Sequence, residues 1–416
     1  MSKSSFYKSL FIVFFLGLSS GLPLSLILST LKALLIEKGF NIKNVGFFAL
    51  VTIPYSLKIF FAPIIDSYKI PFLTKAIGHR KSWIITSQVL LLLTISLLGM
   101  SAIYENLFFI AIFAVLVAIS SASQDIVIDG YRIELFKEED QGPASAFYIY
   151  GYRIGILISG AGALALATIV AWHMVYFFMS LTMLCFIIIT FGIEETRQKF
   201  KKDYISFNAW FRRYVIVPFF DIFKRRKYAS IILAMIFFFK LADAFAGNLI
   251  LPFLLDIGYT KIEIATSLKL FGFFAVLAGV AAGGLLIKNS GIFKVLWVAL
   301  TLQILSNVAF CYLAISNKNF YDLYLIIFFE NFSGGIGDAT LVAYLSGLCN
   351  KKYSATQYAL LASIGSLARS ILSSTAGIYA QSFGWFNFFA FSAILGLPAM
   401  LCLFLLTILN KPINFR

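Results

Sequence analysis

Charged residues are scarce in this sequence. Lys, Arg, Asp and Glu make up 13% of its 416 residues, whereas an ordinary soluble domain carries about 25%. A chain with so few charges cannot cover a folded core with a water-facing surface. Because 60% of its residues are hydrophobic, including 46 phenylalanines, the composition predicts a polytopic membrane protein.

The residue types that hold metals and cofactors are equally few. Two histidines cannot form an HExxH site, and the four cysteines show no metal-ligand spacing. No Walker loop for ATP is present, and no nucleophile and base are arranged for covalent catalysis. We therefore expect no metal, no cofactor and no enzymatic activity. The Gly151-x3-Gly155 pair predicts close helix packing rather than a ligand site.

The chain carries a net charge of +15, which in a soluble protein would suggest nucleic acid. Here Lys and Arg lie mostly between the apolar runs, where the positive-inside rule accounts for them. We expect the lipid bilayer, and no nucleic acid, as the partner of these charges.

Runs of about 20 apolar residues, the length that spans a bilayer, recur twelve times. The only long polar segment, 193–228, divides them into six-helix halves at 1–192 and 229–416. This is an all-α integral membrane fold. The predicted spans are 8–36, 44–65, 82–101, 107–131, 143–170, 173–192, 229–255, 262–287, 292–315, 321–349, 355–382 and 386–410.

The basic residues predict the orientation. The even-numbered connections, the two tails and the linker hold 24 of the 34 lysines and arginines, and the odd-numbered connections hold four. Both termini and the linker should therefore be cytoplasmic. The first apolar run is too long for a signal peptide and is read as an uncleaved helix.

The two halves also repeat each other weakly. SSASQD in the fourth span has an echo in SGGIGD in the tenth, so that Asp125 matches Asp338. Two six-helix halves joined by a basic loop resemble the plan of the major facilitator superfamily, with twelve transmembrane helices. That plan implies a substrate site between the halves, near the membrane midplane.

The loop between the second and third spans resembles a signature of the same superfamily. Asp66 ends the second span, and Gly78, Arg80 and Lys81 follow, although Ala62 stands where the signature has glycine. The resemblance implies that this loop braces the cytoplasmic side through charge and helix-end contacts. An ordinary positive-inside loop is the alternative.

Charges inside the spans are costly and mark function or pairing. Asp125 and Arg153 lie on consecutive helices, and counting 1.5 Å per residue from the turn between them puts them within ~6 Å in depth. Asp338 and Arg369 repeat this arrangement in the second half. Each pair is expected to neutralise itself, bind an anionic substrate, or open when the acid takes a proton.

Five further charged residues lie inside or near the spans. Asp129 sits nearer the cytoplasmic end, as a functional partner of Asp125 or as a solvated helix end. Lys240 and Asp243 have the i,i+3 spacing of a local pair, whereas Lys58 and Glu330 have no evident local partner. The candidate substrate-binding residues are Gln124, Arg153, Lys58, Lys240, Asp243, Arg369, Tyr55 and Tyr152. Candidate proton-coupling residues are Asp125, Asp129, Glu330 and Asp338.

The first half resembles the AmpG muropeptide permeases. The shared segments include SASQDIVIDGYRIELF and YGYRIGILISG, which contain Gln124, Asp125, Asp129 and Arg153 in motif positions. The resemblance implies a monomeric, proton-driven symporter in the bacterial inner membrane. It would carry anhydro-muropeptides from periplasm to cytosol for cell-wall recycling.

Two other functions stay open at this point. Acetyl-CoA transporters share a similar helix-4 segment, so an anionic solute of that kind is an alternative cargo, and a non-transporting muropeptide sensor is another. The second half is less recognisable, and we expect the chain to lack the two extra C-terminal spans of longer AmpG relatives. For a sugar cargo, aromatic side chains supply stacking surfaces; those on or near the second, fifth and sixth spans are Tyr55, Tyr148, Tyr150, Tyr152 and Trp172.

Overall fold

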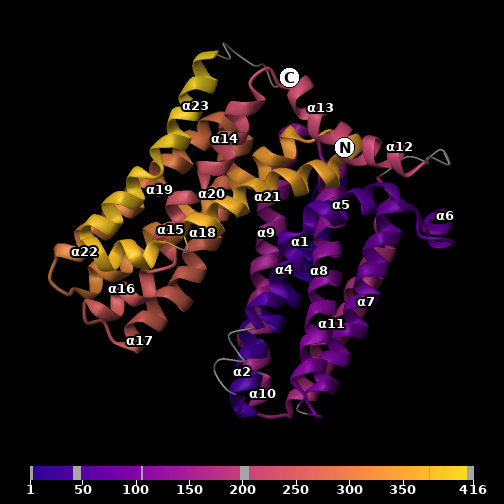
Figure 1. Cartoon of the computed structure of the whole chain (residues 1–416), viewed down its shortest axis with the longest axis horizontal. Helices are drawn as coiled ribbons and strands as arrows, with labels where there is room; N and C mark the ends of the chain where they lie inside the picture. Colours follow the sequence, from indigo (N-terminus) through magenta and orange to yellow (C-terminus); the bar gives the residue numbers. More distant parts are fainter. Residues whose placement is uncertain (1–2, 41–47, 105, 197–205, 374, 410–416) are drawn as a thin grey trace. The chain divides into compact units, whose positions relative to one another are not determined.

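The computed structural model describes residues 3–40, 48–104, 106–196, 206–373 and 375–409. All regular structure in these ranges is helical (Figure 1), which confirms the predicted fold class. Ten of the described helices are long and apolar enough to cross a membrane. A bent pair, Leu50–Ser56 with Lys58–Ser67, makes an eleventh.

The predicted spans 355–382 and 386–410 meet at a break in the backbone. Gly384 has φ 77° and ψ 167° and interrupts the helix Ala376–Ile394, and only glycine adopts this conformation without strain. The preceding helix, Ser354–Ser373, covers most of the predicted eleventh span; the side chains of residues 367–373 lie outside the description.

The chain divides into two compact units that follow the two predicted halves except at three places. The first unit comprises residues up to 137, 147–219 and 349–360, and the second comprises 138–146, 220–348 and 361–416. Two short segments are thus exchanged, and the linker is shared between the units. The boundaries predicted at 192 and 229 stay a prediction.

The first unit is built on five long helical spans and one bent one. Its elements are α1 (Lys3–Ile27), α2 (Ser29–Glu37), η1 (Phe48–Thr52), α4 (Ile53–Ser56), α5 (Lys58–Ser67), α6 (Leu73–Ile77), α7 (His79–Ser101), α8 (Leu107–Leu135), most of α9 (Gln141–Leu157), η3 (Ile158–Gly162), α10 (Ala163–Ala167), α11 (Trp172–Phe191), α12 (Phe207–Phe211) and η4 (Arg212–Ile216). Helix α13 (Val217–Arg225) leads into the second unit.

The second unit contains the helices of the second half. Its elements are η2 (Glu138–Asp140), α14 (Ala229–Phe239), α15 (Leu241–Gly247), α16 (Ile250–Asp256), α17 (Lys261–Ile264), η5 (Ala265–Phe271), α18 (Gly272–Ser290), α19 (Ile292–Ile315), α20 (Phe320–Leu348), α22 (Ala376–Ile394) and α23 (Leu397–Leu409). Helix α21 (Ser354–Ser373) begins in the first unit, after η6 (Lys351–Tyr353), and ends in the second.

Two spans break beside a lysine. The second span bends by 49° between α4 and α5, where Leu57 has φ −89° and ψ 10°, three residues after Pro54. Lys240, with φ −105° and ψ 10°, separates α14 from α15. Broken helices inside a membrane expose backbone groups, which are tolerated where the break is buried or lines a cavity.

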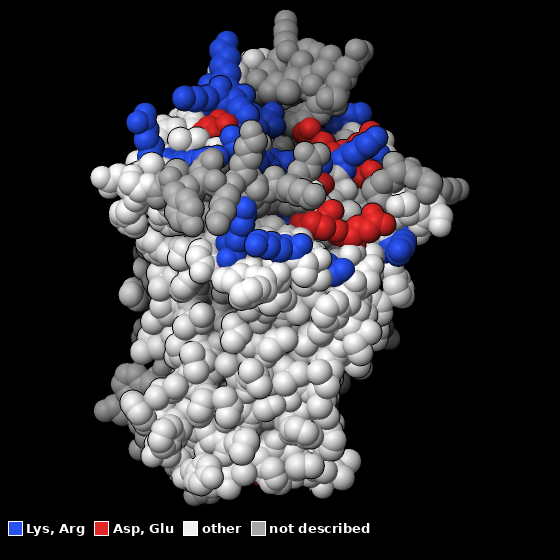
Figure 2. Space-filling view, turned by 90° about the vertical axis from the view of Figure 1, so that its right-hand side faces the viewer, with Lys and Arg blue, Asp and Glu red and all other residues white. Residues whose placement is uncertain are grey.

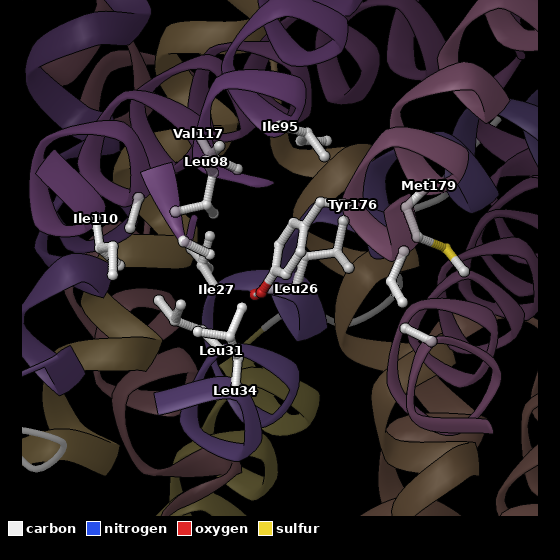
Figure 3. Packing of buried hydrophobic residues seen from close by; sticks show 14 of the residues in the cluster. Leu26, Ile27, Leu31, Leu34, Ile95, Leu98, Ile110, Val117, Tyr176 and Met179 are labelled. Atoms are coloured by element: carbon white, nitrogen blue, oxygen red, sulfur yellow. The ribbon is translucent and has the colours of Figure 1, made fainter. Parts of the chain in front are cut away.

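The core of the first unit is apolar and tightly packed (Figure 3). It is formed by side chains of α1, α2, α7, α8 and α11. The Tyr176 hydroxyl points into this cluster and donates to the Leu26 carbonyl oxygen at 2.8 Å, as a buried phenol must. Trp172 belongs to the same cluster, so it is a core residue and the expected stacking role for it is wrong.

Glycines let α1 and α9 touch. A Cβ placed on Gly151 would lie 1.9 Å from the Phe14 carbonyl oxygen, and one on Gly155 would lie 2.4 Å from that of Leu18. The reverse contact occurs at Gly21, where a Cβ would meet the Tyr152 carbonyl oxygen at 2.0 Å. The close helix packing predicted from Gly151-x3-Gly155 is confirmed.

Charged side chains are unevenly distributed over the surface. On the face drawn in Figure 2 they gather at one end, and a broad uncharged surface extends from them. An uncharged band beside a charged end is the pattern that a bilayer requires, because ionised groups are costly in hydrocarbon.

Candidate functional site

Asp125 is the centre of a buried polar site in the first unit. Lys58 Nζ donates to its Oδ2 at 2.5 Å, and Ser20 Oγ donates to Oδ1 at 2.8 Å. The carboxylate is almost wholly buried, with 5% of its side chain exposed, and 23% of the lysine side chain is exposed. Both carboxylate oxygens are satisfied, as a buried charge requires.

Neighbouring residues extend this site. Lys58 is the first residue of α5, directly after the bend, and its Nζ lies 5.3 Å from the centre of the Tyr55 ring. Gln124 accepts a hydrogen bond from Ser19 Oγ at 3.3 Å. The structure thus brings Lys58 and Tyr55 to the motif residue Asp125, beside Gln124.

The expected partner of Asp125 was Arg153, and the structure corrects this expectation. Asp125 pairs with Lys58 instead, while Arg153 is half-buried on α9. Counting residues gives depth along a helix but not the direction in which a side chain leaves it. Tyr152, beside Arg153, is half-buried, with its ring centre 6.2 Å from that of Tyr148.

Asp129 lies one helical turn after Asp125 and is also buried. Arg132 donates to its Oδ1 at 3.4 Å, and the guanidinium lies 5.4 Å from the Tyr148 ring centre and 5.5 Å from that of Tyr358. No part of the Arg132 side chain is exposed. The alternative that Asp129 is a solvated helix end is therefore wrong.

The second unit has a lysine at its own broken helix. Lys240 Nζ donates to Asp243 at 2.5 Å and lies 3.1 Å from Asp338 Oδ1. The predicted local pair of Lys240 and Asp243 thus includes Asp338. The proposed partner of Asp338, Arg369, has its side chain outside the described residues. A Cβ on Gly337 would lie 1.9 Å from Gln303 Nε2.

Glu330 forms a hydrogen bond with the side chain of the residue that follows it. It is half-buried on α20, and the Asn331 side-chain amide donates to its Oε2 at 2.6 Å. The prediction that Glu330 carries a proton stays a prediction.

A second polar cluster lies where α5 ends and α7 begins. Arg80, fully buried, donates through one guanidinium nitrogen to Asp66 at 2.7 Å and to Glu134 at 2.7 Å. Asp66 is fully buried as well. A buried arginine held between two carboxylates is a strong, charge-assisted contact.

The segment 349–360 is bound to this cluster by four groups. Ser354 Oγ donates to Glu134 at 2.6 Å and accepts from Arg80 at 2.8 Å. The Thr356 amide and hydroxyl both donate to Asp66, at 2.8 and 2.7 Å. Lys351 Nζ donates at 3.1 Å to the Glu134 and Phe136 carbonyl oxygens, at the end of α8.

Helix ends strengthen these contacts. Asp66 lies at the first turn of α21, where backbone N–H groups favour an anion, and Lys351 lies at the last turn of α8, where free carbonyl groups favour a cation. Glu134 and the segment's residues were not predicted. The one signal available was Ser354 before an apolar run, the pattern of a helix N-cap.

Gly78 and Lys81 complete the loop. Gly78 has φ +97°, a backbone conformation that L side chains rarely adopt, and a Cβ there would lie 2.2 Å from Glu195 Oε2, so a substitution would be strained. The Glu195 carboxylate accepts from the backbone amides of Arg80 and Lys81, both at 3.1 Å, and caps α7. Lys81 Nζ donates to the Phe191 carbonyl oxygen at the end of α11, at 2.5 Å.

Comparison with known proteins identifies the family. The model of the Major Facilitator Superfamily matches residues 11–373. The chain is 42% identical over 411 residues to the putative transporter AmpG 4 of Rickettsia felis, which covers 97% of each chain. The chain belongs to the AmpG-type permease family of the major facilitator superfamily. It is a multi-pass membrane transporter and not an enzyme.

A second relative is the anhydromuropeptide permease of Escherichia coli. It is 35% identical over 394 residues, covering 94% of this chain and 78% of that protein. Among solved structures, the human organic anion transporter MFSD10 superposes with a TM-score of 0.72 at 14% identity, covering 96% of this chain and 99% of that one. The proton:xylose symporter XylE gives 0.70 at 10% identity, covering 98% and 96%. These two likenesses concern the fold.

Proposed function

We propose that this permease imports anhydro-muropeptides from the periplasm into the cytoplasm for cell-wall recycling. The observation that carries the proposal is the 35% identity, over nearly the whole chain, to the anhydromuropeptide permease of Escherichia coli. The protein would act as a monomer in the bacterial inner membrane with both termini cytoplasmic, an orientation that the basic connections support.

Asp125 is the proposed proton-coupling residue. Its negative charge holds Lys58 at 2.5 Å in a nearly buried site. Adding a proton to the carboxylate removes the attraction, so the lysine becomes available to a substrate carboxylate. Asp129 lies one turn away and would relay the proton toward the cytoplasmic end. Asp338, held by Lys240, and Glu330 are the second-half candidates.

The cargo presents sugars and carboxylates. Tyr55 and Tyr152 supply aromatic surfaces for sugar rings, and Arg153 supplies a fork for a lactyl or peptide carboxylate. Gln124, at the same level as Asp125, offers an amide to sugar hydroxyls. Lys240, Asp243 and Arg369 are the proposed contributors from the second half.

The cluster of Asp66, Arg80 and Glu134 is the proposed gate. It holds the segment 349–360 to the rest of the first unit through Ser354 and Thr356. In the proposed alternating access this contact opens once in each cycle, since the segment contains the start of helix α21, which continues into the second unit. Gly78 and Lys81 keep the loop in the shape that places Arg80.

Uptake into membrane vesicles tests the transport proposal. Vesicles containing the protein should accumulate labelled GlcNAc-anhydroMurNAc peptide when the outside is made acidic, and accumulate little without a pH gradient. Asp125→Asn should abolish the dependence on the gradient, whereas Asp140→Asn, a half-buried acid outside the site, should not. Uptake of a CoA ester in place of the muropeptide would refute the cargo, and gradient-independent uptake by the wild type would refute the coupling.

A further inference from the structure

The linker between the halves contains a continuous helical segment, Phe207–Arg225, formed by α12, η4 and α13. One face of it packs on the protein. The residues of this face recur every four positions, the spacing that places side chains on one side of a helix. They are Trp210, Tyr214, Pro218 and Ile222, all buried or half-buried.

Two hydrogen bonds fix this face. Trp210 Nε1 donates to Ser67 Oγ at 2.9 Å, at the end of α5. The Pro218 carbonyl oxygen accepts from Gln357 Nε2 at 2.9 Å. The segment is therefore held in one orientation, with a defined outer face.

The outer face is apolar and exposed. Phe220, 53% exposed, is the most exposed of a stripe at i, i+3, i+4 and i+7. A large apolar side chain forgoes burial free energy when it is left exposed to water. The stripe consists of Ile216, Phe219, Phe220 and Phe223.

Cations flank the stripe. Arg212 precedes Ile216 by four residues and Lys224 follows Phe220 by four, and both are exposed, as is Arg213. Residues 207–227 contain six basic residues and one acidic residue, and that acid, Asp221, is paired with Arg225 at 2.7 Å. An apolar stripe flanked by cations is the composition of helices that lie in a membrane interface.

We propose that the segment Phe207–Arg225 lies in the bilayer interface and binds anionic phospholipid headgroups. The stripe inserts among the upper acyl carbons, and Arg212 and Lys224 contact the phosphates. The apolar stripe and the flanking cations are both needed to identify an anionic phospholipid as the ligand. A soluble anion would use the cations and leave the phenylalanines in water, and a zwitterionic lipid carries its own cation beside the phosphate.

Retention of lipid by the purified full-length protein tests the proposal. The protein is equilibrated with equal amounts of phosphatidylglycerol and phosphatidylcholine of the same acyl chains, and retained lipids are counted by native mass spectrometry. Wild type should prefer phosphatidylglycerol, and R212Q/K224Q should lower the preference about fivefold or more, as expected from the attraction of each cation to an anionic headgroup. The control K75Q/K294Q removes two exposed lysines elsewhere.

The apolar half of the proposal is tested separately. Phe220→Gln should reduce retention of both lipids, and Phe220→Leu should restore it. The proposal is overturned by equal preference in R212Q/K224Q and the control, or by no preference in wild type. It is also overturned if 10 mM inorganic phosphate displaces phosphatidylglycerol as well as excess lipid does, since the site would then bind the free anion.

Discussion

Replacing Arg80 by methionine should release the segment 349–360 from the rest of the first unit. Methionine has a similar apolar stem but no guanidinium, so Asp66, Glu134 and Ser354 lose the group that joins them. Removing one partner of a buried ion pair costs about 3–5 kcal/mol. Since ~1.4 kcal/mol is a factor of ten, the opening equilibrium of the segment should shift by about two orders of magnitude or more.

Hydrogen exchange measures this shift locally. The Thr356 amide donates to Asp66, so its exchange reports release of the segment. Protection of the peptide 351–360 should fall about 100-fold in Arg80→Met. In Arg80→Lys, the protection of this peptide should lie between those of wild type and Arg80→Met. Lysine keeps the positive charge but cannot donate to two carboxylates through a planar guanidinium.

Two results would refute this reasoning. Protection that stays within tenfold of wild type would mean that the arginine does not hold the segment. An equal loss of protection in peptides from the first turns of α8 would mean that the whole unit has unfolded. Lys75→Met, an exposed lysine in the same loop, provides the control and should leave exchange unchanged.

Two further substitutions test the helix packing and the substrate site. Gly151→Ala should destabilise the protein by ~3 kcal/mol, because the added methyl meets the Phe14 backbone. A thermal melt measures this change. Gly162→Ala is the control and should have no such effect, because a Cβ there meets nothing closer than 4.0 Å. Arg153→Ala should lower muropeptide uptake at least tenfold with unchanged membrane level and melting temperature. A variant that fails to accumulate would assign Arg153 a structural role.

Much of the fold was predictable because apolar runs have a physical length. The bilayer sets about 20 residues for a span, and ten or eleven of the described helices are long and apolar enough to cross it, where twelve were predicted. The breaks were harder. Gly384 carries a positive φ that glycine allows, but the break at Lys240 has no proline or glycine beside it and coincides with the ion pairs that Lys240 makes with Asp243 and Asp338.

The residues of the site could be predicted from the sequence, but the ion pairs and hydrogen bonds between them could not. Asp125, Gln124, Lys58 and Tyr55 stood out because charged and polar groups are costly in an apolar helix. Their pairing depends on rotation about each helix axis and on the bend before Lys58, and neither is encoded in depth along the chain. The gate residues Glu134 and Thr356 were missed, since each is ordinary until the fold brings it to Asp66 and Arg80.

The exchanged segments have a consequence for synthesis of the protein. Residues 349–360 supply the first unit with Ser354 and Thr356, and residues 138–146 supply the second unit from early in the chain. Until residues 349–360 have been made, the cluster of Asp66, Arg80 and Glu134 therefore lacks the hydrogen bonds that Ser354 and Thr356 supply. The first unit is begun first but is not complete until residues 349–360 have been made, and an N-terminal fragment ending at the linker would lack part of its own fold.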